Sequence, residues 1–184
     1  MLIETQNIER ILFPEAAIAR RVAALAQELQ GKLQGERPVM VCVLKGAVFF
    51  FADLCRQMDC PMDLDFLQVS SYGMDTVSSG EIRLKKDLER DVAGRTVVLV
   101  EDIVDSGLTL RYLEQLLAKR GAKRVLTVAF LDRGTPATDL KGFSVGDGFV
   151  VGYGLDYAEQ YRNLPYIATM KLKSDTIKIR RYAL

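Results

Sequence analysis

The sequence contains no histidine among its 184 residues. This absence excludes Ser-His-Asp and Cys-His nucleophile systems, histidine-ligated zinc and a histidine general base. Any proton transfer that the protein performs must therefore use the side chains of Asp, Glu, Lys, Tyr or Cys.

Cysteine is scarce as well. The three cysteines are Cys42, Cys55 and Cys60, and their spacing matches neither a metal-ligand motif nor a Cys-x-x-Cys redox motif. Because Cys42 lies in an apolar run, we expect it to be buried, and we expect all three thiols to be reduced and inert.

Excess charge and long apolar segments are missing too. The formal net charge is +1, so no long-range field points to nucleic acid or an anionic membrane, and any phosphate site must be built locally. The longest apolar stretch, residues 39–54, is too short to span a bilayer and contains Lys45 and Asp53. Residues 1–5 lack the basic and apolar regions of a signal peptide, and we therefore expect a cytoplasmic protein.

The sequence does contain enough apolar material for one folded domain. Its residues are 49% hydrophobic and 27% charged, a mixture that lets a chain of this length bury a substantial core. We therefore expect a single domain over residues 1–184.

Hydrophobic periodicity predicts alternating helices and strands. Helices are predicted at residues 14–30, 47–57 and 108–120. Strands are predicted at residues 38–44, 62–70, 96–100, 124–131, 148–153 and 165–171. Pro14 suits the first turn of the first helix, and Gly31 is its predicted stop signal. This alternation predicts an α/β fold with a mainly parallel sheet, in which ligands bind outside the carboxyl ends of the strands.

The end of the strand at 96–100 combines two chemistries. Glu101 and Asp102 follow the strand, and residues 105–109, Asp-Ser-Gly-Leu-Thr, turn into the next helix. The N–H groups of such a turn favour an anion, whereas the carboxylates would repel a phosphate unless they bind hydroxyls or a divalent cation. A ribose 5-phosphate with magnesium satisfies both requirements. The residues alone leave open a second interpretation, in which Asp105 is an N-cap and the other two carboxylates are solvated.

A longer string carries a family resemblance. Residues 98–110, Val-Leu-Val-Glu-Asp-Ile-Val-Asp-Ser-Gly-Leu-Thr-Leu, closely resemble the phosphoribosyl-pyrophosphate signature of type I phosphoribosyltransferases, and in particular of their hypoxanthine-guanine branch. The resemblance implies a type I phosphoribosyltransferase fold, with a mainly parallel central sheet flanked by helices. It also implies a core over about residues 10–135 and a small hood formed by N-terminal residues and by residues 136–184.

The same resemblance implies an activity. Members of this branch transfer the 5-phosphoribosyl group from phosphoribosyl pyrophosphate to N9 of hypoxanthine or guanine, giving IMP or GMP and pyrophosphate in purine salvage. We therefore expect a magnesium-dependent pentosyltransferase that forms a homodimer or homotetramer. We expect phosphoribosyl pyrophosphate and a 6-oxopurine base as its ligands, and no nucleic acid or membrane as a partner.

The resemblance assigns roles to the signature residues. Glu101 and Asp102 would hold the ribose hydroxyls and, together with Asp156, magnesium. The 5-phosphate would be bound by Asp105, Ser106, Gly107, Leu108 and Thr109. Asp105 is also the best candidate to accept or steer the N7 proton of the purine, because a chain without histidine offers few other bases.

Two further segments match the pyrophosphate-binding parts of the family. Leu44-Lys45-Gly46 resembles the loop that helps to bind pyrophosphate. The segment 161–165, Tyr-Arg-Asn-Leu-Pro, resembles the one whose arginine contacts pyrophosphate. The resemblance therefore implicates Lys45, Gly46 and Arg162 in binding this group.

Two other segments match the lid and the purine-binding hood. Ser71-Tyr72-Gly resembles the start of the long flexible loop that closes over the reaction centre. Residues 149–157 resemble the hood. By that similarity, Phe149 stacks on the purine, the backbone of Val150 reads its edge, and Asp156 lies near the second magnesium and the purine 2-position.

One position departs from the family pattern. The family usually has a lysine just after the strand equivalent to residues 125–131, where its ammonium group donates to the purine 6-oxo group, and this sequence has Arg133. Arginine is also a cationic donor, but its planar fork is bulkier. Arg133 therefore either reads the 6-oxo group or faces solvent, and the preference among hypoxanthine, guanine and xanthine stays open.

Two other interpretations compete with the transferase. A regulator that keeps this fold and senses the sugar phosphate should carry an added DNA-binding region or a basic face, and the sequence shows neither. A Rossmann-type oxidoreductase needs a third glycine at the required spacing after Gly152-Tyr-Gly154, which the sequence lacks.

Overall fold

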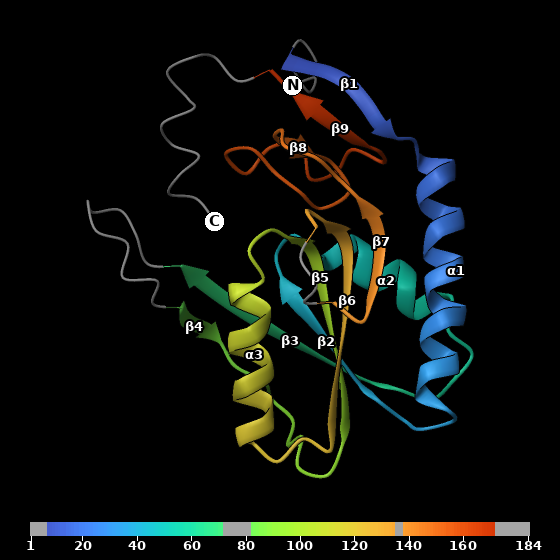
Figure 1. The fold of residues 1–184 in the computed structure, drawn as a ribbon, viewed down its shortest axis with the longest axis vertical. Helices are drawn as coiled ribbons and strands as arrows, with labels where there is room; N and C mark the ends of the chain where they lie inside the picture. The colour runs from blue at the N-terminus through green and yellow to red at the C-terminus, as the bar shows by residue number, and fades with distance from the viewer. Residues whose placement is uncertain (1–6, 72–81, 135–137, 172–184) are drawn as a thin grey trace.

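The computed structural model describes residues 7–71, 82–134 and 138–171, which form two sheets and three helices (Figure 1). The elements are, in chain order, β1 (Ile8–Phe13), α1 (Glu15–Leu33), β2 (Val39–Leu44), α2 (Val48–Arg56), β3 (Asp63–Ser71), β4 (Ile82–Lys86), β5 (Thr96–Val104), α3 (Leu108–Lys119), β6 (Arg124–Asp132), β7 (Leu140–Ser144), β8 (Val150–Val151) and β9 (Ile167–Met170). Ser71, at the start of the expected lid, is the last residue of β3. Tyr72 and the rest of that lid lie outside the described residues.

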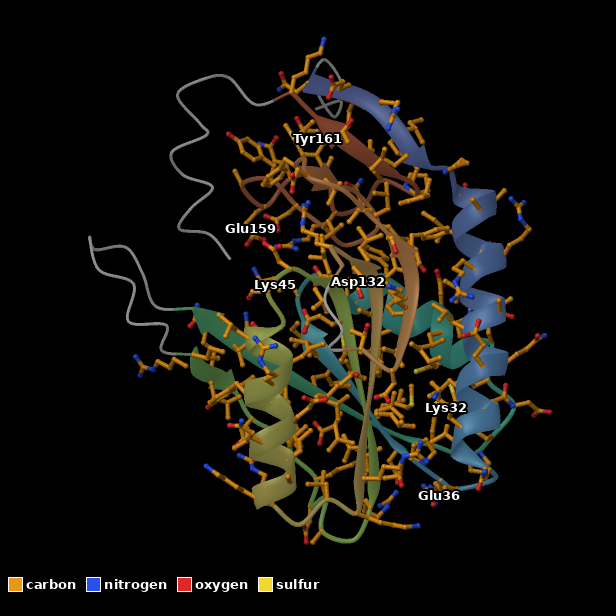
Figure 2. The ribbon with its side chains drawn as sticks, in the orientation of Figure 1. Lys32, Glu36, Lys45, Asp132, Glu159 and Tyr161 are labelled. Carbon is orange, nitrogen blue, oxygen red and sulfur yellow. The ribbon has the colours of Figure 1, made fainter. Side chains whose placement is uncertain are left out.

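The larger sheet has the strand order β4-β3-β2-β5-β6-β7. Its neighbouring strands pair in parallel except β3 and β4, which are antiparallel. The prediction of a mainly parallel α/β sheet is therefore confirmed. The parallel strands end at one edge, and Figure 2 shows Lys45 and Asp132 toward that edge, whereas Lys32 and Glu36 lie at the opposite end of the molecule.

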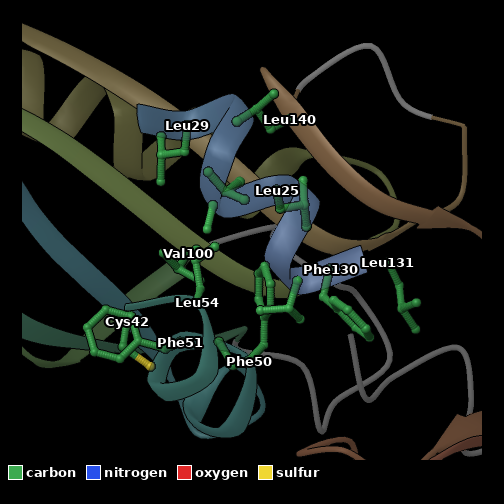
Figure 3. Close-up of a cluster of buried hydrophobic side chains, with 14 of the residues drawn as sticks. Leu25, Leu29, Cys42, Phe50, Phe51, Leu54, Val100, Phe130, Leu131 and Leu140 are labelled. Carbon is green, nitrogen blue, oxygen red and sulfur yellow. The ribbon is translucent and has the colours of Figure 1, made fainter. Parts of the chain in front are cut away.

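Helices cover both faces of the larger sheet. On one face, α1 and α2 contribute Leu25, Leu29 and Phe50 to an apolar cluster (Figure 3). On the other face, α3 contributes Leu113 and Leu117 to a second cluster. Successive residues of β2 belong in turn to the first and to the second cluster, because successive side chains of a strand point to opposite faces. None of the described helices has the length and apolarity that crossing a membrane requires.

The predicted ends of the first helix are wrong at both termini. Pro14 is the N-cap residue, one position before α1, rather than a residue of the first turn. Gly31 does not stop the helix, which continues to Leu33 and ends at Gln34 with a φ of 50°. A glycine inside a helix costs about 1 kcal/mol. Here the buried side chains of Leu29 and Leu33 anchor the last turns on either side of it.

Strand β5 is longer than its apolar run predicts. Ile103 and Val104 continue the parallel pairing with β6, so the strand ends at Val104. Glu101 and Asp102 therefore lie within the strand rather than after it. The backbone that carries these two candidate residues is fixed by the sheet.

A smaller antiparallel sheet, in the order β1-β9-β8, joins the two ends of the described chain. In Figure 1 it lies beyond the carboxyl ends of β2, β5 and β6, where the family resemblance implies a hood. Strand β1 was not predicted from the sequence. Strand β7 was not predicted either, and it pairs with β6 in the larger sheet, which therefore extends to Ser144, past the expected hood boundary.

The cysteines are free thiols, as predicted. Burial, followed by the nearby carboxylates of Glu101 and Asp102, raises the pKa of Cys42 to about 12. Burial and the neighbouring Cys60 raise the pKa of Cys55 to about 12. Both thiols therefore stay protonated at neutral pH, which agrees with the expectation that they are inert.

Candidate active site

Three distant segments meet at the carboxyl ends of β2 and β5. The loop after β2 brings Gly46 against β5, because a Cβ atom on Gly46 would lie 1.6 Å from Oδ2 of Asp102. The segment after β8 brings Gly154 against the same loop, because a Cβ atom on Gly154 would lie 1.9 Å from the carbonyl oxygen of Gly46. Only glycine fits at position 154, where the clash is with backbone, whereas a side chain at position 46 would displace the carboxylate of Asp102. The sheet edge that the sequence predicts as the ligand site is thus where the candidate residues converge.

Glu101 and Asp102 form a carboxylate pair on β5. Burial, then the charge of Asp102, raises the pKa of Glu101 well above its usual value. Burial also raises the pKa of Asp102, although the hydrogen bond with the Glu101 side chain, and then the backbone N–H of Ile103, 2.8 Å from Oδ1, partly oppose that rise. Among the described residues, buried Oε2 of Glu101 has no hydrogen-bond partner. An unsatisfied buried carboxylate is costly, which makes this pair a candidate for binding hydroxyls or a cation.

The turn that follows β5 leads directly into α3. Gly107, with a φ of 73°, is the N-cap residue, and no side chain caps the helix. Oγ of Ser106 accepts a long hydrogen bond of 3.4 Å from the N–H of Leu108. The interpretation of Asp105 as the helix N-cap is therefore wrong. The first N–H groups of α3 lack a carboxylate cap, so the turn can bind an anion through these groups.

Asp105 is half-exposed beside this anion-binding turn. Its Oδ1 lies 3.9 Å from Nε of Arg133, with 44% of the Asp105 side chain and 17% of the Arg133 side chain exposed. The aspartate is therefore accessible to a ligand, whereas the arginine is largely covered. Arg133 does not extend into solvent, which removes one of the two alternatives for this residue.

Arg133 ties the end of β6 to the loop before β8. Its Nη1 donates to the carbonyl oxygen of Gly146 at 2.5 Å, and its Nη2 donates to that of Gly148 at 2.7 Å. Phe149 follows this loop, and its ring meets that of Tyr157 edge-on, with centroids 5.6 Å apart at 89°. Val150 begins β8 and is buried. Arg133 thus binds the segment that carries the other two candidate purine residues, Phe149 and Val150.

The two candidate pyrophosphate cations share an acidic partner. Lys45 Nζ lies 3.2 Å from both carboxylate oxygens of Glu159, and Figure 2 shows these residues on neighbouring segments. Arg162 Nη2 lies 2.7 Å from Oδ1 of Asp156 and 3.3 Å from Oε2 of Glu159. Nε of Arg162 is buried without a hydrogen-bond partner among the described residues. Sequence reasoning missed Glu159, because an acidic residue in a turn carries no local signal.

The carboxylates do not form a metal cage by themselves. Within the described ranges, no three Cys, Asp or Glu side chains are grouped so that they could hold a metal ion. Magnesium is usually bound through one or two carboxylates together with substrate phosphates, rather than by protein alone. The unsatisfied oxygen of Glu101 beside Asp102 fits that kind of shared site.

Comparison with known proteins agrees with this geometry. The chain matches the family model of the phosphoribosyl transferase domain over residues 11–158. This chain belongs to the phosphoribosyltransferase family. The membership confirms the type I phosphoribosyltransferase fold and the resemblance that the signature carries. It also excludes the Rossmann-type oxidoreductase.

The relatives of this phosphoribosyltransferase cover nearly all of it. It is 49% identical over 170 residues to the hypoxanthine-guanine phosphoribosyltransferase of Bacillus subtilis (strain 168), which covers 90% of this chain and 94% of the relative. It is 41% identical over 171 residues to the enzyme of the same name from Streptococcus thermophilus (strain CNRZ 1066), covering 90% of this chain and 95% of the relative.

Solved structures have the same fold. A hypoxanthine-guanine phosphoribosyltransferase from Bacillus anthracis superposes with a TM-score of 0.85 at 37% identity, covering 89% of this chain and 99% of that one. A hypoxanthine phosphoribosyltransferase from Staphylococcus aureus superposes with a TM-score of 0.84 at 37% identity, covering 90% and 93%. The fold is therefore shared along almost the whole chain.

Proposed function

We propose that this phosphoribosyltransferase works in purine salvage. It transfers the 5-phosphoribosyl group from phosphoribosyl pyrophosphate to N9 of hypoxanthine or guanine, and it releases IMP or GMP and pyrophosphate. The observation that carries the proposal is the close approach of Asp102, beside the buried Oε2 of Glu101, to the Lys45–Gly46 loop and an uncapped helix N-terminus. The names of the relatives support the choice of base.

The sugar phosphate binds at the end of β5. Glu101 and Asp102 accept hydrogen bonds from the 2- and 3-hydroxyls of the ribose, which satisfies the unpartnered oxygen of Glu101. The 5-phosphate lies against the turn of residues 105–109, where backbone N–H groups and the dipole of α3 favour an anion. These contacts fix the anomeric carbon in position, and positioning is a large part of catalysis.

Glu101 and Asp102 would hold one Mg²⁺ together with substrate oxygens, and Asp156 would lie near a second. When bound, magnesium neutralises the charge of the leaving pyrophosphate. Both oxygens of Asp156 already have protein partners, Arg162 and the N–H of Glu159. A carboxylate oxygen has more than one lone pair, so these contacts are compatible with a metal ion.

The pyrophosphate binds to Lys45, the backbone at Gly46, and Arg162. The buried, unpartnered Nε of Arg162 supports this assignment, because it is a charged donor that still lacks an acceptor. The cations stabilise negative charge as the bond to the anomeric carbon breaks.

The purine stacks on Phe149, and the backbone of Val150 reads its edge. Asp105 accepts the N7 proton as N9 attacks the anomeric carbon, and its half-exposed carboxylate beside Arg133 supports this role. Arg133 donates to the 6-oxo group through N–H groups that are not used by Gly146 and Gly148. A guanidinium has five N–H donors, of which those two carbonyls take two.

A pyrophosphate-release assay tests the whole proposal. The protein is mixed with Mg²⁺, phosphoribosyl pyrophosphate and one base at a time, namely hypoxanthine, guanine or xanthine. Pyrophosphate should appear together with IMP or GMP. A protein that binds the sugar phosphate but releases no pyrophosphate with any purine would be a regulator instead.

Chelation of magnesium should abolish that release. EDTA in excess over Mg²⁺ should slow pyrophosphate formation by more than about a hundredfold, since metal stabilisation of the leaving group is worth several kcal/mol. Adding Mg²⁺ back should restore the rate. Full activity in EDTA would contradict the assignment of Glu101, Asp102 and Asp156 to a metal.

Replacement of Arg133 by lysine should weaken base binding. Lysine lacks the planar fork whose two nitrogens reach the carbonyls of Gly146 and Gly148 separately, so we expect the loop before Phe149 to lose a charged hydrogen bond. The KM for hypoxanthine should rise about tenfold, with the KM for phosphoribosyl pyrophosphate unchanged. The exposed Arg20→Lys variant is the control. A lower KM for hypoxanthine in Arg133→Lys would show that the arginine fork is not needed.

Assembly and location complete the proposal. The protein forms a homodimer or homotetramer. The exposed Val48 and Phe49 on α2 support this, as does a 34% identical hypoxanthine phosphoribosyltransferase of Trypanosoma cruzi studied for its oligomeric state. It acts in the cytoplasm, which fits its three free cysteines, and it binds neither nucleic acid nor membrane. Light scattering coupled to size-exclusion chromatography measures the oligomeric state directly.

A further inference from the structure

Glu159 lies between the two cations assigned to pyrophosphate. Its two carboxylate oxygens are each 3.2 Å from Nζ of Lys45, and Oε2 is also 3.3 Å from Nη2 of Arg162. Lys45 and Arg162 come from segments 117 positions apart, and one carboxylate bridges them. A phosphate group that contacted both cations would make the same two contacts.

A tight turn presents this carboxylate to the cations. Tyr157 and Gln160 exchange backbone hydrogen bonds of 3.0 and 3.1 Å, and Ala158 and Glu159 between them have φ values of 51° and 62°. Two successive residues in the left-handed region are unfavourable for residues with a side chain. Oδ2 of Asp156 holds the N–H of Glu159 at 2.8 Å. The position of Glu159 is thus specified by its own backbone, not only by its cationic partners.

Glu159 is paired with two cations, but its contact with Lys45 is exposed to solvent. The hydrogen bond from Lys45, and then that from Arg162, lowers the pKa of Glu159, so the carboxylate stays ionised at neutral pH. The Glu159 side chain is 66% exposed and that of Lys45 is 55% exposed. Exposed ion pairs are worth little, so another anion can replace this one at small cost.

We propose that Glu159 is an internal competitor of pyrophosphate, whose carboxylate binds Lys45 and Arg162 until a phosphate-bearing ligand displaces it. The proposal rests on the assignment of these two cations to pyrophosphate in the proposed function. Its consequence is a weaker affinity for pyrophosphate than the two cations alone would give. The competition speeds the release of pyrophosphate as a product.

The Glu159→Gln variant tests the competition, because it removes the charge and keeps the size of the side chain. Isothermal titration calorimetry with inorganic pyrophosphate and Mg²⁺ should give a Kd about three- to tenfold lower than for the unmodified protein. Glu159→Ala should show the same change, since the effect comes from the missing charge. Glu89→Gln is the matched control, because Glu89 also forms an exposed pair with a lysine, Lys86, at 2.9 Å.

Turnover gives a second readout that a purely structural role would not move. The inhibition constant of pyrophosphate and the KM for phosphoribosyl pyrophosphate should fall by the same factor as the Kd, with the KM for hypoxanthine unchanged. An unchanged or weaker affinity for pyrophosphate in both Glu159 variants overturns the proposal. The titration needs no turnover, so it tests Glu159 even if the pyrophosphate-release assay shows that the proposed function is wrong.

Discussion

Asp105→Asn should lower kcat with hypoxanthine by about 10²–10⁴-fold, the usual contribution of a general base. The KM for phosphoribosyl pyrophosphate should change little, because the backbone N–H groups of the turn stay in place. An asparagine keeps the shape of the side chain, but it cannot accept the N7 proton. Steady-state kinetics with each substrate varied in turn separates the two effects.

The reason to choose Asp105 over other acids is its setting. Glu101 and Asp102 are half-buried within β5, where we propose that they bind the sugar, whereas Asp105 is half-exposed beside Arg133. Asp59→Asn, at an exposed position outside the site, is the control. Wild-type kcat in Asp105→Asn would remove Asp105 from the proton transfer and leave it a phosphate-binding role only.

The central strands could be predicted from the sequence because they are buried on both faces. Strands β2, β5 and β6 read as continuous apolar runs, and the structure places them side by side in parallel. Strands β1 and β7 could not be predicted in this way. Each has several exposed or half-buried residues, and β1 is held by antiparallel pairing with β9 from the far end of the chain. That pairing is a tertiary interaction that no local pattern reports.

The candidate site also has one part that could be predicted from the sequence and another that could not. The turn of residues 105–109 is a local motif, so its position before α3 followed from the sequence. The partners of Glu159 and of Arg133 could not be predicted. Glu159 meets Lys45 across 114 positions of sequence, and Arg133 binds backbone carbonyls, which every residue has. Long-range contacts of charged side chains need the folded structure.

Gly154→Ala should abolish activity and destabilise the protein, although the substitution adds one methyl group. The new Cβ would lie 1.9 Å from the carbonyl oxygen of Gly46, which is backbone and cannot rotate away. Gly154 also has a φ of 103°, a conformation that costs a residue with a side chain about 1–3 kcal/mol. The hood segment must therefore move away from the Lys45–Gly46 loop.

That movement would displace Arg162, because Gly154 and Arg162 form two hydrogen bonds with each other. Nη1 of Arg162 donates to the carbonyl oxygen of Gly154 at 2.8 Å, and the N–H of Gly154 donates to the carbonyl oxygen of Arg162 at 2.9 Å. A shift of about 1 Å in a positioning group can cost a hundredfold in rate, so kcat/KM for phosphoribosyl pyrophosphate should fall at least that far.

The matched control is Gly31→Ala inside α1, where no atom lies within 4 Å of the added Cβ. That variant should keep full activity and gain up to about 1 kcal/mol in the free energy of unfolding, because alanine favours a helix. Thermal denaturation and steady-state kinetics of both variants make the comparison. If Gly154→Ala matched Gly31→Ala in activity, the close approach of Gly154 and Gly46 would not be required for catalysis. A rise in the KM for phosphoribosyl pyrophosphate would instead distinguish Gly154→Ala, which displaces a proposed pyrophosphate cation, from Asp105→Asn, which should lower kcat with little change in that KM.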